Sequence, residues 1–146
     1  MSLVTQRRSP SRLLVKLQGV LDAELGAELC ASLERELAGV REVLFDLRWL
    51  SGHDDAGRAA LLRAHAKVQG AAIRSAYVTV HPRVRSLVFQ LCQETQDPHV
   101  RPVPSEVMAE AWFSAPDQIR FADQSFEAAD RLLTSTGRKP TTMPST

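Results

Sequence analysis

The chain has 146 residues, a length that fits one domain with its own hydrophobic core better than two independent domains. Its 18 Lys and Arg residues stand against 17 Asp and Glu residues, so the charge indicates neither a nucleic-acid partner nor an acidic membrane surface. Residues 1–10 lack the apolar core of a signal peptide and no run has the length of a membrane span, which predicts a cytoplasmic protein.

The first half of the chain alternates strand and helix patterns. Residues 3–6 and 12–17 are β-compatible runs on either side of a turn-rich break, which predicts an N-terminal β-hairpin. Asp22 is then the expected N-cap of an amphipathic helix with the apolar stripe Leu25, Leu29, Leu33 and Leu37. Residues 43–47 are nearly all apolar, as in a central strand covered on both faces.

The alternation continues in the second half. A helix is expected from Asp55 or Gly57 to Gly70, a strand over 73–80, and a helix that has Pro82 in its first turn. Residues 99–103 predict a short edge strand, and a closing helix follows that carries Val107, Met108, Ala111 and Trp112. Alternating strands and helices predict an α/β fold with about four to five mostly parallel strands and about four helices.

This predicted domain covers residues 1–115. Residues 116–133 either extend it or form its true last strand, at 119–121, and last helix, at 126–133, in which case the segment near Pro102 is an insert. Residues 134–146 are rich in Thr, Pro and Ser and are expected to be a disordered tail. Cys30 and Cys92 lie in apolar helical patterns, which predicts buried reduced thiols, with a disulfide as the alternative; no cofactor or metal is expected.

Three stretches resemble the STAS family, as found in anti-sigma-factor antagonists, over roughly residues 12 to 113. They are Leu-Gln-Gly-Val-Leu-Asp at 17–22, Val-Leu-Phe-Asp-Leu at 43–47, and Leu-Ser-Gly-His-Asp-Asp-Ala-Gly-Arg-Ala-Ala-Leu-Leu at 50–62. The first is similar to the family's G-x-L-D opening of its first helix, and the third to its D-S-x-G-x-x-x-L loop. The resemblance implies a non-enzymatic signalling module for partner switching, which binds an anti-sigma factor, a kinase or another STAS protein, including a second copy of itself.

In the family, a Ser or Thr that accepts a phosphoryl group follows the loop Asp. Here Asp55 occupies that place, directly after Asp54. An aspartate has no hydroxyl to phosphorylate, but it places about one negative charge where phosphoserine places about −1.5 to −2. The resemblance therefore implies a module that phosphorylation does not switch, either because it mimics the phosphorylated form or because it serves a constitutive partner.

The loop before the second helix is the densest polar cluster, at the sheet end where open α/β folds bind ligands. It is interpreted either as helix capping alone or as capping combined with partner recognition, in which Gly57 allows a partner to approach closely. The predicted partner-binding residues are His53, Asp54, Asp55, Ala56, Gly57, Arg58 and Asp22. A metal site from three adjacent residues of this loop is disfavoured, because such residues rarely converge on one ion.

No catalytic motif appears, so no enzyme is predicted. His65 is expected to be solvated on the polar flank of its helix, Trp49 to lie in the core or at its edge, and Trp112 with Phe113 either to form an exposed interface or to pack on the sheet. The surface arginines expected are Arg74, Arg83, Arg85 and Arg101. The alternative function is a SpoIIAA-like carrier of a small ligand or lipid, with an apolar pocket under the closing helix near Val107, Met108 and Trp112.

Overall fold

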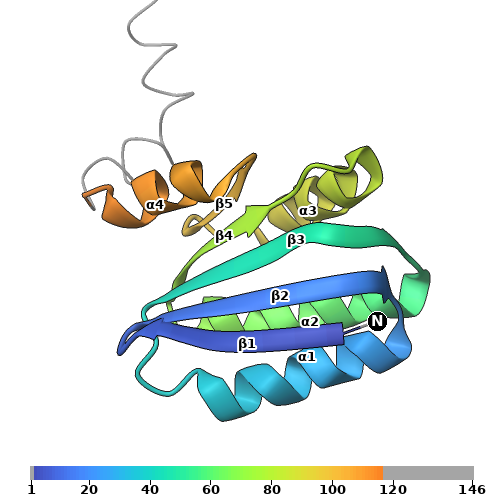
Figure 1. Cartoon of the computed structure of the whole chain (residues 1–146), viewed down its shortest axis with the longest axis horizontal. Helices are drawn as coiled ribbons and strands as arrows, with labels where there is room; N and C mark the ends of the chain where they lie inside the picture. Colours follow the sequence, from blue (N-terminus) through green and yellow to red (C-terminus); the bar gives the residue numbers. More distant parts are fainter. Residues whose placement is uncertain (1, 117–146) are drawn as a thin grey trace, which may run out of the picture. The chain divides into compact units, whose positions relative to one another are not determined.

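A computed structural model describes residues 2–116, which form one five-stranded sheet and four helices (Figure 1). The elements follow in the order β1 (Ser2–Ser9), β2 (Arg12–Leu21), α1 (Ala23–Glu36), β3 (Glu42–His53), α2 (Asp55–Gly70), β4 (Arg74–Val78), α3 (Pro82–Thr95), β5 (Val100–Val103) and α4 (Glu106–Ser114). The chain divides after Ser114 into two units, and these elements belong to the first. The strand, helix and tail expected at 119–121, 126–133 and 134–146 lie outside the described residues.

The strands are arranged in their sequence order, β1-β2-β3-β4-β5. The pair β1–β2 is the predicted antiparallel hairpin, and every other neighbouring pair is parallel. Each parallel step is crossed by one helix, because parallel neighbours cannot be joined by a tight turn. The predicted α/β class is therefore confirmed, with β3 extending well beyond the expected residues 43–47.

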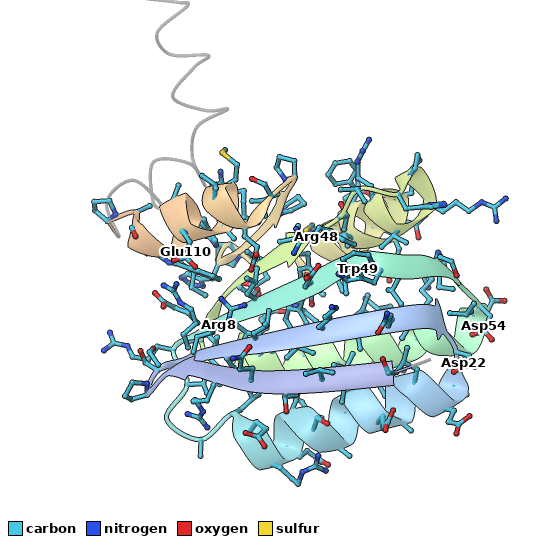
Figure 2. The ribbon with its side chains drawn as sticks, viewed as in Figure 1. Arg8, Asp22, Arg48, Trp49, Asp54 and Glu110 are labelled. Atoms are coloured by element: carbon cyan, nitrogen blue, oxygen red, sulfur yellow. The ribbon has the colours of Figure 1, made fainter. Side chains whose placement is uncertain are left out.

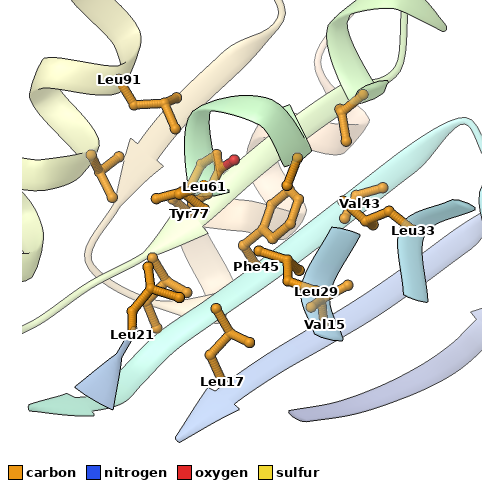
Figure 3. Packing of buried hydrophobic residues seen from close by; sticks show 14 of the residues in the cluster. Val15, Leu17, Leu21, Leu29, Leu33, Val43, Phe45, Leu61, Tyr77 and Leu91 are labelled. Atoms are coloured by element: carbon orange, nitrogen blue, oxygen red, sulfur yellow. The ribbon is translucent and has the colours of Figure 1, made fainter. Parts of the chain in front are cut away.

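One face of the sheet carries the main core, which α1, α2 and α3 cover (Figure 3). The rings of Phe45 and Tyr77 stack at its centre with 4.4 Å between centroids. Three of the four residues of the stripe predicted on α1 are fully buried, and Leu37 is a half-buried C-cap. Gly26 lets α1 approach α2 closely, because a Cβ there would lie 2.3 Å from the Cβ of Ala60. Aliphatic packing on this face is the principal source of stability.

The opposite face of the sheet is partly covered by α4. The indole nitrogen of Trp112 donates a hydrogen bond to the carbonyl oxygen of Ser75 on β4, 2.9 Å away. The guanidinium of Arg74 donates to the backbone carbonyls of Trp112 and Phe113 at the end of the helix. Trp112 and Phe113 therefore pack on the sheet, which decides between the two interpretations of this pair. The prediction of a solvated Arg74 is wrong, because α4 folds over it and buries it.

The prediction that Trp49 lies in the core or at its edge is also wrong, since 53% of this residue is exposed. In the β2–β3 register Lys16 pairs with Asp46, but Gln18 pairs with Trp49, so β3 holds one extra residue over this stretch. Such a bulge reverses the direction in which the following side chains point. It turns Trp49 to the face that carries α4, where the ammonium of Lys16 lies 4.9 Å from the centre of its ring.

Neither cysteine is in a disulfide, in agreement with the expected reduced thiols, although both are half-buried rather than buried. Burial, together with the nearby Asp97 carboxylate, raises the pKa of Cys92 to about 11. The Cys92 thiol is therefore protonated at neutral pH, which makes it a poor nucleophile.

Candidate functional site

The predicted loop lies where β2 and β3 end side by side. Leu21 pairs with His53 at the ends of these strands, and the backbone N–H of Asp54 donates to the carbonyl of Leu21 at 3.1 Å. A helix begins directly after each strand, so Asp22 and Asp54 lie at the same edge of the sheet (Figure 2). The topology therefore brings two helix N-termini together at the carboxyl ends of two parallel strands.

Two aspartates cap these helices. Asp22 accepts a hydrogen bond from the backbone N–H of Leu25 at 2.9 Å, and Asp54 accepts one from the N–H of Gly57 at 2.7 Å. Both contacts satisfy donors that a helix N-terminus leaves unpaired, and both carboxylates meet the positive end of a helix dipole. The predicted capping role is confirmed for both residues.

Asp55 occupies a different position from Asp54. It is exposed in the first turn of α2 and, within residues 2–116, it has no hydrogen-bond or ion-pair partner. Glu24 is exposed in the corresponding turn of α1. The two helix starts thus present four carboxylates, which we call the acidic edge: Asp22, Glu24, Asp54 and Asp55.

The other predicted loop residues have varied surroundings. Ala56 is exposed beside Asp55 and His53 is half-buried. Arg58 turns toward α3, where it donates to the amide oxygen of Gln90 at 3.2 Å and forms an ion pair with Glu94. Arg58 therefore links two helices of the same molecule. Within the described residues, no group of three or more His, Cys, Asp or Glu side chains is placed to hold a metal ion.

Gly57 allows a close approach of its own chain. It is buried, and a Cβ at this position would lie only 1.9 Å from the carbonyl oxygen of Leu21. The start of α2 can therefore pack directly on the end of β2. Gly57 therefore positions the loop, and its part in partner recognition stays a prediction.

A second polar cluster, which the sequence did not predict, lies inside the domain. The Nδ1 atom of His65 is 2.8 Å from the hydroxyl of Tyr77, and its Nε2 atom is 2.8 Å from Oδ2 of Asp97. The other oxygen of Asp97 accepts from the backbone N–H of His99. The prediction of a solvated His65 is wrong, because the residue is fully buried. Its four-residue spacing from the core residue Leu61 was the signal for an inward position.

The environment of this cluster shifts the pKa values of Asp97 and Tyr77. Burial raises the pKa of Asp97, but hydrogen bonds from His65 and from the backbone of His99 outweigh it, so the pKa is lowered overall. Burial also raises the pKa of Tyr77 well above its ordinary value. The cluster joins α2, β4 and the α3–β5 connection. Because His65 and Tyr77 have no exposed surface, it does not face a substrate.

The apolar pocket expected under the closing helix is not formed by the predicted residues. Val107 is 77% exposed and Met108 is 50% exposed on the outer side of α4, while Trp112 packs on the sheet. A shallow groove of about 180 Å³ lies elsewhere, lined by Thr79, Arg85, Phe89, Pro102, Val103 and Pro104. Typical small-molecule pockets have volumes of about 300–1,000 Å³. The groove is small for a lipid.

No protein-family model matches the sequence, and no curated protein matches it. Among the described residues, no helix combines the length and the apolar character that crossing a membrane requires.

Solved structures, in contrast, match the fold. The anti-sigma factor antagonist SpoIIAA in its unphosphorylated form is similar with a TM-score of 0.59 at 16% identity, over 79% of this chain and 99% of that one. The phosphorylated form of the Bacillus cell fate determinant SpoIIAA gives 0.58 at 18% identity, over 75% and 98%. An uncharacterized DUF3478-family protein from Shewanella loihica, described as having a SpoIIAA-like fold, gives 0.58 at 20% identity, over 76% and 91%. The chain has the SpoIIAA-like, or STAS, fold.

Proposed function

We propose that this protein is a non-enzymatic, cytoplasmic regulatory module of the STAS type, which recognises a protein partner through the acidic edge. The partner surface would be basic, as in a groove of an anti-sigma factor or kinase. The observation that carries the proposal is the position of Asp55, which is exposed, and has no hydrogen-bond or ion-pair partner among residues 2–116, on the helix start where the family resemblance places the phosphorylated residue.

The different surroundings of the two loop aspartates, Asp54 and Asp55, support this function. The carboxylate of Asp54 caps α2 by accepting a hydrogen bond from the backbone N–H of Gly57, so it stabilises the fold. Asp55 adds negative charge at the same helix start and makes no hydrogen bond or ion pair within residues 2–116. A charge that stabilises no internal contact is available for recognition, and charges at the rim of an interface act mainly on partner choice and association rate.

The same residue bears on regulation. A STAS protein that is switched by phosphorylation gains negative charge at this place, whereas Asp55 holds a charge permanently. We therefore infer constitutive recognition of one partner. A carrier of small ligands or lipids is the less well supported alternative, because Val107 and Met108 point away from the sheet and the groove found elsewhere is small.

Reversing the charge of Asp55 is expected to release the partner. The wild-type protein, Asp55→Lys and Glu34→Lys would each be immobilised and exposed to lysate of the source organism, and retained proteins identified by mass spectrometry. We expect the dissociation constant of the retained partner to rise at least about tenfold in Asp55→Lys, because two basic groups would then face each other.

Glu34→Lys is the control, since it makes the same change of charge on an exposed residue near the end of α1, about 15 Å along the helix from Glu24. It also removes the solvent-exposed ion pair between Glu34 and Lys67, which are 3.3 Å apart, and such pairs contribute only about 0–1 kcal/mol. It should retain the partner as the wild type does. The same capture by Asp55→Lys as by wild type would contradict the proposal. Weakening of the wild-type complex with added salt would agree with a charged contact.

A further inference from the structure

The two edges of the sheet differ in how open they are to another strand. The edge strand β5 has four residues, contains Pro102 and is followed by Pro104. Proline cannot donate to a neighbouring strand, so short proline-bearing edges resist pairing. The opposite edge strand, β1, has eight residues, and within residues 2–116 only β2 pairs with it.

The first part of β1 lacks the features that keep sheet edges apart. Residues 2–6 read Ser-Leu-Val-Thr-Gln, with no charge and no proline, and pair with β2 in unbroken register. The protective features begin only later, with Arg7, Arg8 and the irregularity between Arg7 and Ser9. Val4 lies at the centre of the unprotected stretch and is 50% exposed.

We propose that two copies of this chain associate by antiparallel pairing of their β1 strands, centred on Val4. In this register Val4 faces Val4 of the second copy, Leu3 faces Thr5, and Ser2 faces Gln6. The two five-stranded sheets would then form one continuous sheet of ten strands. This interface is independent of the proposed function, since it uses the edge of β1 and none of the acidic edge.

Geometry and charge select this register. Opposed side chains in a sheet point to the same face, so a twofold axis through the junction must pass through a residue rather than between two. Centring on Val4 pairs all five uncharged residues. Centring on Thr5 would instead place Leu3 opposite Arg7. With Val4 at the centre, the Arg7 residues of the two copies are six positions apart, about 20 Å, which exceeds the screening length of about 8 Å at physiological salt.

The faces of the two sheets also match. Val4 pairs with Lys16 and therefore lies on the face that carries Trp49. Leu3 packs toward the main core on the other face. In the joined sheet the exposed valines of the two copies would cover each other, while the partly buried Leu3 would contact Thr5 of the second copy. The pairing would therefore add a valine–valine contact to one face of the sheet and a Leu3–Thr5 contact to the other.

Sedimentation or light scattering over a range of concentrations tests this pairing. The wild type is expected to be a dimer, and Val4→Lys and Val4→Asp, each tested alone, to raise the dimer dissociation constant at least about tenfold, because like charges would face each other at the axis. Val4→Asp is included in case Val4→Lys does not fold. The new carboxylate would lie opposite Lys16 on β2, a contact between opposite charges. Val107→Lys is the control, at a more exposed valine on α4, and should stay dimeric.

Mixing the two variants gives the decisive measurement. If Val4 faces itself, Val4→Lys and Val4→Asp chains should form a mixed dimer that neither forms alone. A wild type that stays monomeric up to its solubility limit overturns the proposal. So does a mixture that fails to associate, or a Val107→Lys variant that dissociates as readily as Val4→Lys. Circular dichroism of each variant confirms that only association has changed.

Discussion

Replacing Asp97 by alanine is expected to lower the free energy of unfolding by about 2–5 kcal/mol, because two hydrogen bonds to its carboxylate are lost and each donor left unsatisfied costs about 1–3 kcal/mol. The change leaves Nε2 of His65 without its partner 2.8 Å away, inside a domain where the histidine has no access to water. It also removes the acceptor of the His99 backbone N–H. Urea unfolding followed by circular dichroism measures the loss.

Asp97→Asn separates charge from shape in this cluster. The pKa of Asp97 is lowered, because the hydrogen bonds from His65 and His99 outweigh burial. Its contribution to stability is therefore complete above the unfolded-chain pKa of about 3.9 and is lost as the pH falls through the lower folded-state pKa. Below about pH 4 the wild type should lose stability more steeply than Asp97→Asn. Equal slopes, or a loss below about 1 kcal/mol in Asp97→Ala, would show that the cluster stabilises little.

Substituting Gly57 by alanine is expected to destabilise the protein by about 3 kcal/mol or more, at the upper end of the usual cost of overpacking. The new Cβ would lie 1.9 Å from the carbonyl oxygen of Leu21, and a backbone atom cannot rotate away as a side chain can. Either α2 or the end of β2 must move. The change in urea midpoint at constant slope gives the magnitude.

Gly52→Ala provides the matched control for this substitution. Gly52 is the last residue but one of β3, just before the same loop, but no atom lies within 4 Å of the Cβ that alanine would add. Its stability should stay within about 0.5 kcal/mol of the wild type. A similar loss in Gly52→Ala and Gly57→Ala would indicate that backbone freedom, rather than contact with Leu21, explains both.

The sequence was sufficient for features that depend on local periodicity and capping. The stripe on α1 and the caps Asp22 and Asp54 follow from residues three or four positions apart, and the structure has them as predicted. Alternation of strands and helices was likewise enough to predict parallel pairing, because parallel neighbours need a crossover connection. The order of the strands in the sheet was not predicted.

The wrong predictions concern residues whose surroundings come from distant parts of the chain. Trp49 follows a buried run, but one extra residue in β3 reverses its direction. His65 has polar partners in β4 and after α3, which no local pattern of α2 contains. Arg74 is buried by α4, 38 residues later. Val107 and Met108 are apolar, yet Ala109, Trp112 and Phe113 form the buried side of that helix.

The bulge in β3 has a spectroscopic consequence. The chain has two tryptophans, and they experience opposite environments: Trp49 is mostly in solvent, whereas Trp112 is 5% exposed. A dissolved ion such as iodide reaches the first indole and not the second. The fluorescence that iodide quenches therefore reports on the part of this sheet face, around Trp49, that α4 leaves uncovered. The fluorescence that iodide does not quench reports on the packing of α4. A molecule that bound to the uncovered part of this face would shield Trp49 from iodide, while the emission of Trp112 stayed constant.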